Sequence, residues 1–209
     1  MLATRLKAGT ASGASLYFSG IYPDQTDTTV YTYSGVDLGV ADSDRIICVL
    51  SASSTTSSVS ATIAGSPMTS QFSEVALGGR TSCFTASVPS GSSADVVLTY
   101  GANAGYSHIF VWSLYGVNET PVDTLLDAAN DDQRSVTLST SPKRIILGGA
   151  LGVGSSGVDW TGITEVDDIS AGRRLSAANE VGDFTNQTVS ADLNGARGSA
   201  LVVVSFSEE

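Results

Sequence analysis

A short apolar segment of this chain occurs twice, and the segments around it repeat with it. Arg45-Ile46-Ile47 recurs as Arg144-Ile145-Ile146, each time after a stretch rich in turn residues. Three further matches follow in the same order: residues 59–62 with 158–161, Gly79-Arg80 with Gly172-Arg173, and 107–114 with 199–206. Four ordered matches at nearly constant offset indicate an internal duplication. We therefore expect two similar antiparallel strand arrays, over residues 40–117 and 139–207, joined by the acidic segment 118–133.

Short apolar segments between turn clusters predict that these arrays consist of β-strands. Residues 28–36 alternate aromatic and β-branched side chains, and residues 45–50 form a nearly continuous apolar run, which is typical of a buried strand. Turn clusters such as Gly78-Gly79 separate the segments, at the spacing of an antiparallel sandwich or barrel. The best helix signal is residues 122–129, where apolar side chains share one face after Pro121, and we expect a short helix there.

The duplication permits two architectures. Each half could form its own small sandwich, or both halves could interleave into one jelly-roll-like sandwich. Halves of about 70–80 residues bury apolar surface inefficiently, so we favour one shared core. The predicted fold class is all-β, an antiparallel jelly-roll-like β-sandwich built from two similar strand arrays. We expect an N-terminal docking arm at residues 1–22 and the sandwich domain at 23–209.

The composition excludes several classes of protein. The chain has 10 Lys+Arg against 21 Asp+Glu, a net charge of −11, and its polarity comes mainly from 32 Ser, 21 Thr and 22 Gly. This mixture is unsuited to a helical bundle, and the negative charge argues against binding nucleic acid or anionic membranes. Two cysteines make neither a disulfide scaffold nor a zinc cluster. The N-terminus carries no apolar stretch of signal-peptide length, so we expect synthesis in a host cytoplasm without a secretion signal.

The chemistry-bearing residues favour a protein without catalysis, metal or cofactor. His108, the only histidine, lies within an apolar segment with no Gly-x-Ser-x-Gly motif, and we interpret it as a strand histidine. Cys48 and Cys83 lie inside predicted strands and are expected to be buried thiols, with a disulfide as the alternative. The acidic residues of segment 127–132 lack the spacing of a calcium loop, although a calcium site there stays open.

Aromatic residues near strand ends are the candidates for binding. Exposed Tyr and Trp rings stack on sugars or anchor protein interfaces, but they also close the ends of a sandwich. We select Trp160, Tyr106 and Tyr115 as candidate binding residues, and Trp160 follows a Gly-Ser stretch that favours its exposure.

Several stretches together resemble a known group of proteins. These are residues 34–39 (Ser-Gly-Val-Asp-Leu-Gly), 44–47 (Asp-Arg-Ile-Ile), 62–65 (Thr-Ile-Ala-Gly), 88–96 and 159–165. They resemble small Ser/Thr/Gly-rich β-sandwich virion structural proteins of tailed bacteriophages, of the head decoration, accessory or tail-tip type. The shared motifs are turn glycines and strand starts, so the resemblance implies a structural protein of a phage particle and identifies no active site.

The leading functional hypothesis is a non-enzymatic virion surface protein, a capsid decoration or accessory protein that stabilises or ornaments the particle. We expect a homotrimer that binds the major capsid protein or other virion proteins. The arm residues Leu2, Arg5, Leu6 and Lys7 would dock onto the particle by strand addition. The alternative is a tail-tip host-recognition module that binds cell-surface polysaccharide. A carbohydrate-binding or adhesive module of cellular origin is a weaker third hypothesis, and an enzyme is the least favoured.

Overall fold

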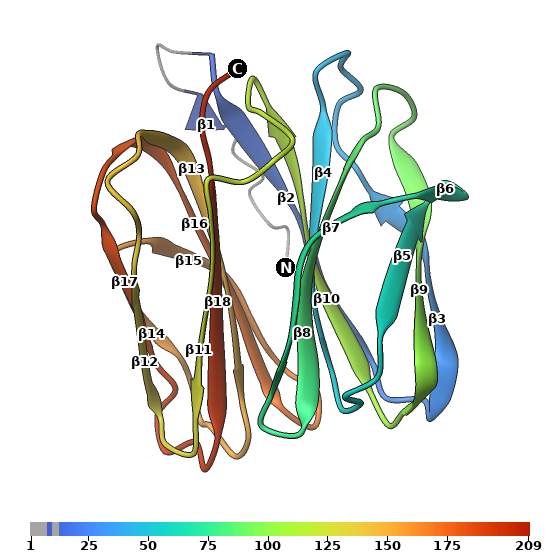
Figure 1. The fold of residues 1–209 in the computed structure, drawn as a ribbon, viewed down its shortest axis with the longest axis vertical. Helices are drawn as coiled ribbons and strands as arrows, with labels where there is room; N and C mark the ends of the chain where they lie inside the picture. Colours follow the sequence, from blue (N-terminus) through green and yellow to red (C-terminus); the bar gives the residue numbers. More distant parts are fainter. Residues whose placement is uncertain (1–7, 10–12) are drawn as a thin grey trace.

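The computed structural model describes residues 8–9 and 13–209, which form strands and no helix (Figure 1). The strands are β1 (Ala8–Gly9), β2 (Ser15–Asp24), β3 (Thr28–Asp37), β4 (Ile46–Ser53), β5 (Val59–Ile63), β6 (Ser66–Pro67), β7 (Thr69–Ala76), β8 (Gly79–Ser87), β9 (Ser93–Ala104), β10 (Ser107–Tyr115), β11 (Asp123–Ala129), β12 (Gln133–Thr137), β13 (Lys143–Gly152), β14 (Asp159–Thr161), β15 (Thr164–Ser170), β16 (Arg174–Phe184), β17 (Thr188–Asp192) and β18 (Ser199–Phe206). All the strand pairs are antiparallel. The predicted all-β class is confirmed.

The two halves of the chain have the same strand order. In the first half one sheet reads β1-β2-β10-β4-β8-β7 and the other β3-β9-β5-β6. In the second half the sheets read β11-β18-β13-β16-β15 and β12-β17-β14. We leave out the two-residue β1, count from β2 in the first half and from β11 in the second, and take β6 and β7 as one bent strand. Each half then places its first, last, third, sixth and fifth strands in one sheet and its second, seventh and fourth in the other. This nested order defines a jelly roll, so the chain is a tandem of two jelly rolls.

The Arg-Ile-Ile match and the match of 107–114 with 199–206 mark equivalent positions in the two rolls. The Gly-Arg match is displaced by one residue, because Arg80 pairs with Ser53 whereas Arg174, not Arg173, pairs with the equivalent Gly152. Ile46 pairs with Leu114 and Ile145 with Phe206, so both isoleucines stand at the same place in the central strands. The duplication is longer than expected, because β2 and β3 of the first roll correspond to β11 and β12 of the second. The predicted helix at residues 122–129 is wrong. Residues 123–129 are β11, which pairs with β18 along its whole length, and this tertiary pairing outweighs a weak local helix signal.

The N-terminal segment is divided between the sandwich and the undescribed residues. Residues 15–22, which we expected in the arm, belong to β2 and pair with β10. The predicted docking residues Leu2, Arg5, Leu6 and Lys7 lie outside the described residues. Any arm therefore ends before β2 begins.

Three apolar cores replace the single shared core that we favoured. One lies between the two sheets of the first roll and one between those of the second. The third lies between the rolls, where Cys48, Phe110 and Trp112 of the first pack with Leu147 and Val204 of the second. Side chains of β4 alternate between the inter-roll core and the core of the first roll, which explains the uninterrupted apolar run. The third core adds the buried surface that each small roll lacks alone.

Candidate functional site

The three predicted aromatic binding residues do not share one surface. Trp160 is half-buried on β14, its indole N–H donates to Ser176 Oγ at 2.8 Å, and it belongs to the core of the second roll. Tyr115 is buried at the end of β10 and its hydroxyl donates to the carbonyl oxygen of Val40 at 2.8 Å. Tyr106 directly precedes the opposite end of β10. They therefore offer no common stacking platform for a sugar.

The cysteines and the acidic segment have structural surroundings. Cys48 and Cys83 are free and buried, with their sulfur atoms 3.8 Å apart, as expected for buried thiols. Burial raises the pKa of the Cys48 thiol well above its usual value, which makes it unreactive. In the acidic segment, Asp127 and Asp131 form ion pairs with Arg134. Within the described ranges, no three His, Cys, Asp or Glu side chains are grouped so as to hold a metal ion.

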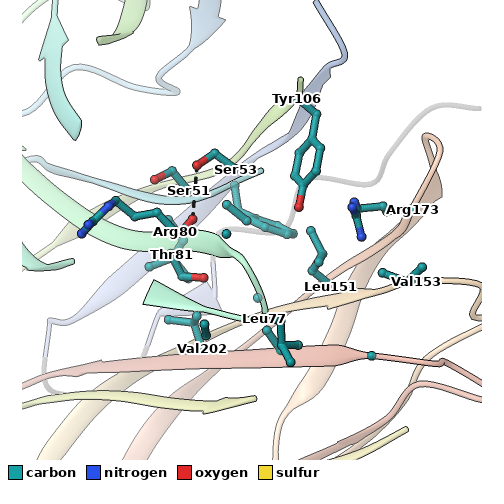
Figure 2. A pocket seen from close by; sticks show the side chains of 18 of the residues that line it. Ser51, Ser53, Leu77, Arg80, Thr81, Tyr106, Leu151, Val153, Arg173 and Val202 are labelled. Carbon is teal, nitrogen blue, oxygen red and sulfur yellow. Dashed lines mark hydrogen bonds between the residues drawn. The ribbon is translucent and has the colours of Figure 1, made fainter. Parts of the chain in front are cut away.

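One cavity lies between the two jelly rolls and has a volume of about 190 Å³ (Figure 2). Its apolar lining comes from both rolls: Leu50 and Phe110 from the first, Leu151 and Val202 from the second. Leu77 and Val153 also line it and are 46% and 39% exposed, so the cavity opens to solvent on that side. Both rolls contribute the ends of their central strands, so the cavity exists only when the rolls are packed together.

A second cavity, of about 250 Å³, adjoins the first. Tyr106, Val153 and Arg173 line both cavities, whereas His108 lines only the second cavity. The Arg173 side chain extends from the β15–β16 turn toward Tyr106 and Leu151 (Figure 2). The two cavities together form one site, in which an apolar compartment adjoins a compartment lined by polar groups.

Tyr106 links the polar groups of this site. Its ring is stacked on that of His108, with ring centroids 4.9 Å apart and an interplanar angle of 17°, and Arg173 Cζ lies 4.4 Å from the centroid of the Tyr106 ring. His108 is fully buried, and among the described residues neither ring nitrogen has a hydrogen-bond partner. Burial and then the Arg173 charge lower the pKa of His108 to about 4, so the imidazole is neutral at pH 7. The site thus combines a guanidinium with a neutral imidazole that has unused hydrogen-bonding capacity.

Cations at the inter-roll cavity differ from those elsewhere. Arg134, Lys143, Arg144 and Arg174 form ion pairs with Asp or Glu. Arg45 is buried and donates to main-chain carbonyl oxygens instead. In the part of the chain that the structure describes, no carboxylate pairs with Arg80, Arg173 or Arg197, and all three line the cavity.

Arg80 has a different role from the other two arginines of the cavity. Its guanidinium donates to the carbonyl oxygen of Thr56 at 2.6 Å and to Ser73 Oγ at 2.9 Å, and it extends away from Tyr106 and Arg173 (Figure 2). The sequence matched Gly79-Arg80 with Gly172-Arg173, but it gave no signal that Arg80 and Arg173 line one cavity between the rolls. Arg197 has no counterpart in that pattern, and His108 was interpreted only as a strand histidine.

Comparisons with known proteins give no family. No protein-family model matches the chain, and no curated protein matches it. Viral capsid proteins are among the weakly similar solved structures. The major capsid protein P2 of bacteriophage PM2 is 9% identical, with 94% of this chain and 98% of that chain covered and a TM-score of 0.29. A chain of Sulfolobus turreted icosahedral virus is 16% identical, with 100% and 61% covered and a TM-score of 0.21.

A cupin 2 conserved barrel domain protein from Leptotrichia buccalis is similar to the same degree, with 7% identity, coverage of 97% of this chain and 88% of that chain, and a TM-score of 0.24. Similarity at this level carries no argument about function. The jelly-roll assignment rests on the strand order alone, and that fold hosts many unrelated functions. No helix of the described residues is long and apolar enough to span a membrane.

Proposed function

We propose that this chain is a non-enzymatic structural protein of a virus particle, displayed on the particle surface. The observation that carries the proposal is the back-to-back pair of jelly rolls joined by a continuous apolar core. We expect such a block, whose halves share an apolar core, to resist proteolysis outside a cell. Jelly rolls occur in viral capsids as well as in lectins and cupins, so the fold supports this function by analogy.

The outer faces of the two rolls fit a surface role. In each roll the sheet that faces away from the other roll is the outer sheet: β3-β9-β5-β6 in the first and β12-β17-β14 in the second. The outward positions of these sheets carry mainly hydroxyls, including Thr32 and Thr99 in the first roll and Ser135, Thr137 and Thr188 in the second. Hydroxyls keep these faces hydrated without concentrating charge. Together with the resemblance of the sequence to phage virion proteins, this favours a decoration or accessory protein of the capsid, assembled as a homotrimer on the major capsid protein.

The tail-tip alternative has weaker support. Host recognition through polysaccharide was expected to use Trp160, Tyr106 and Tyr115, and these rings lie on separate parts of the molecule. Trp160 packs in the second core, and Tyr115 is buried. The three predicted aromatic residues therefore do not favour this function over decoration.

The test is to locate and count the chain in particles. Particles would be grown from the host that carries the gene, heads and tails separated on a density gradient, and the chain quantified by mass spectrometry against the major capsid protein. We expect on the order of hundreds of copies in the head fraction, because capsid-surface positions repeat with the symmetry of the shell. Absence from particles would overturn the virion function, and a few copies in the tail fraction would replace decoration with the tail-tip function.

A deletion tests the docking arm separately. Removing residues 2–7 leaves β2 and its pairing with β10 intact. We expect the truncated protein to fold and trimerise but to be depleted from heads, whereas Thr32→Ala on an outer sheet is incorporated normally. Undiminished incorporation of the truncated chain would contradict the arm as the docking element.

A further inference from the structure

We propose that the paired cavities between the two jelly rolls bind a small amphipathic carboxylate. Its apolar chain of about six to eight carbons occupies the inter-roll cavity, and its carboxylate accepts hydrogen bonds from Arg173 and His108 in the adjoining cavity. Every group that lines this site belongs to one chain, so ligand binding does not require the protein to be part of a virus particle.

The volume of the inter-roll cavity sets the size of the apolar part. A dry cavity of about 150 Å³ lined by aliphatic and aromatic side chains is large enough for benzene. The inter-roll cavity measures about 190 Å³ and is lined by Leu50, Phe110, Leu151 and Val202. A linear chain of about six to eight carbons or a phenylalkyl group has a matching volume and chemistry.

The arginines favour an anion. In a chain with a net charge of −11, a carboxylate partner would be easy to supply, and four other cations have one. Arg173 and Arg197 line the cavity and have no carboxylate partner within the described part of the chain. A guanidinium beside an apolar cavity gains most from a ligand that brings its own carboxylate, since charge-assisted hydrogen bonds are strong where water is displaced.

His108 supplies independent support for a polar head group. It is fully buried and lines the second cavity, yet no group in residues 8–9 and 13–209 forms a hydrogen bond with either ring nitrogen. Buried polar groups in folded proteins are nearly always hydrogen-bonded, so an unpartnered imidazole facing a cavity indicates a missing acceptor or donor. A neutral imidazole donates one N–H, and a carboxylate held by Arg173 can accept it.

Residues at equivalent positions of the two rolls contribute differently to the site. Ser107 and Ser199 begin equivalent strands, so the position of Tyr106 corresponds to Gly198 and that of His108 to Ala200. The first roll therefore supplies the aromatic and imidazole groups, while the second supplies small residues that leave the space open. Arg173 enters from the turn of the second roll and completes the arrangement.

The experiment uses the full-length protein and sodium octanoate, titrated by calorimetry, with octylamine and octanol as matched ligands. We expect one octanoate per chain with a dissociation constant on the order of 1 mM or tighter, weaker binding of octanol, and no binding of octylamine. Equal affinity for octanol and octanoate would overturn the carboxylate part of the proposal, and no saturable binding of octanoate would overturn the site.

Two variants separate the site from general effects of charge. Arg173→Gln should weaken octanoate binding by about tenfold or more, whereas Arg144→Gln, which removes an arginine that is ion-paired with Asp183 and Glu208, should leave it unchanged. An equal loss in both variants would show that net charge, not the site, controls binding. Thermal unfolding of each variant without ligand reports whether it is folded.

The single histidine provides a second readout. Because the chain contains one His, its imidazole signals in an NMR spectrum are unambiguous. Octanoate should shift these signals in the wild-type protein and in Arg144→Gln, and the shift should saturate over the octanoate concentrations that the dissociation constant from calorimetry predicts. Binding without a change at His108 would overturn the head-group position, even if octanoate occupied the apolar cavity. Neither measurement depends on particles, so failure here is separate from failure of the proposed virion function.

Discussion

The two jelly rolls share a strand order, but they use the repeated Arg-Ile-Ile segment differently. Arg45 of the first roll is fully buried, and its guanidinium donates to the carbonyl oxygens of residues such as Leu38, Val88 and Ser90. Arg144, its equivalent, lies at the surface in ion pairs with Asp183 and Glu208. Identical residues at equivalent positions thus have unequal surroundings, so a sequence repeat predicts the strand but not the role of its side chain.

In the second roll the buried cation is Lys143, the residue directly before Arg144. Lys143 is fully buried, donates to the carbonyl oxygen of Ser139 at 2.7 Å and forms an ion pair with Asp123 at 3.2 Å. The register of β13 against β16 shifts between Lys143 and Ile145. Such a bulge changes the direction of neighbouring side chains, which explains how Lys143 takes the interior position and Arg144 the exterior one.

The largest expected effect comes from Arg45. Replacing it by Leu leaves several buried carbonyl oxygens without a donor, so Arg45→Leu should lower the free energy of unfolding by about 3–5 kcal/mol. The matched change Arg144→Leu removes only surface ion pairs and should cost about 1 kcal/mol or less. Urea unfolding followed by tryptophan fluorescence measures both. Similar losses in the two variants would show that the rolls do not differ in this way.

The second prediction compares His108 with its equivalent in the second roll, Ala200, which cannot titrate. The pKa of His108 is lowered from 6.5 to about 4 by burial and by Arg173, and Asp24 opposes this shift. Since the unfolded chain binds the proton more readily, stability is complete above pH 6.5 and falls as the pH drops toward 4. The loss should reach about 3 kcal/mol, given about 1.4 kcal/mol per pKa unit.

The variant His108→Phe isolates this contribution, because it keeps a ring against Tyr106 and removes the titration. Urea midpoints at pH 7.5 and 4.5 should fall more for the wild-type protein than for the variant. If both proteins lose the same stability between these pH values, His108 is not held neutral by the fold.

The sequence predicted the strands better than their contacts. Apolar runs such as residues 45–50, together with the ordered repeats, were sufficient for the all-β class and for the equivalence of the two halves. The short helix at 122–129 was predicted wrongly because its apolar spacing is local, whereas β11 is determined by pairing with β18. The inter-roll site depends on Arg173, which is far in sequence from Tyr106 and His108 and reaches them only because the two rolls pack together.

The surroundings of Trp160 differ from its sequence context for a related reason. The Gly-Ser stretch before it favoured exposure, but a Cβ on Gly148 would lie 2.8 Å from both the Trp160 ring and Ile163 Cδ1, so the glycine makes room for both side chains. By the offset of the repeats, Gly148 corresponds to Val49 and Trp160 to Ala61, both in the core of the first roll. The first roll has Val49 and Ala61 at these two positions, whereas the second roll has Gly148 and Trp160. No pattern within either segment reveals such an exchange.

The smallest predicted effect tests this exchange. Gly148→Val should overpack the second core and lower the free energy of unfolding by about 1–3 kcal/mol. Gly149→Ala is the control on the same strand, because its added carbon meets Leu50 and Phe110 at ordinary distances of 3.4 and 3.5 Å and should cost less.

Adding Trp160→Ala to Gly148→Val rebuilds the pair found in the first roll. The double variant should be more stable than the sum of the two single losses predicts, with a coupling of about 1–2 kcal/mol measured by a double-mutant cycle in urea. Strictly additive losses would mean that Val at position 148 is accommodated without displacing the Trp160 ring. In that case the small size of Gly148 would not be what makes room for Trp160, and the residues at these two positions would vary independently between the two cores.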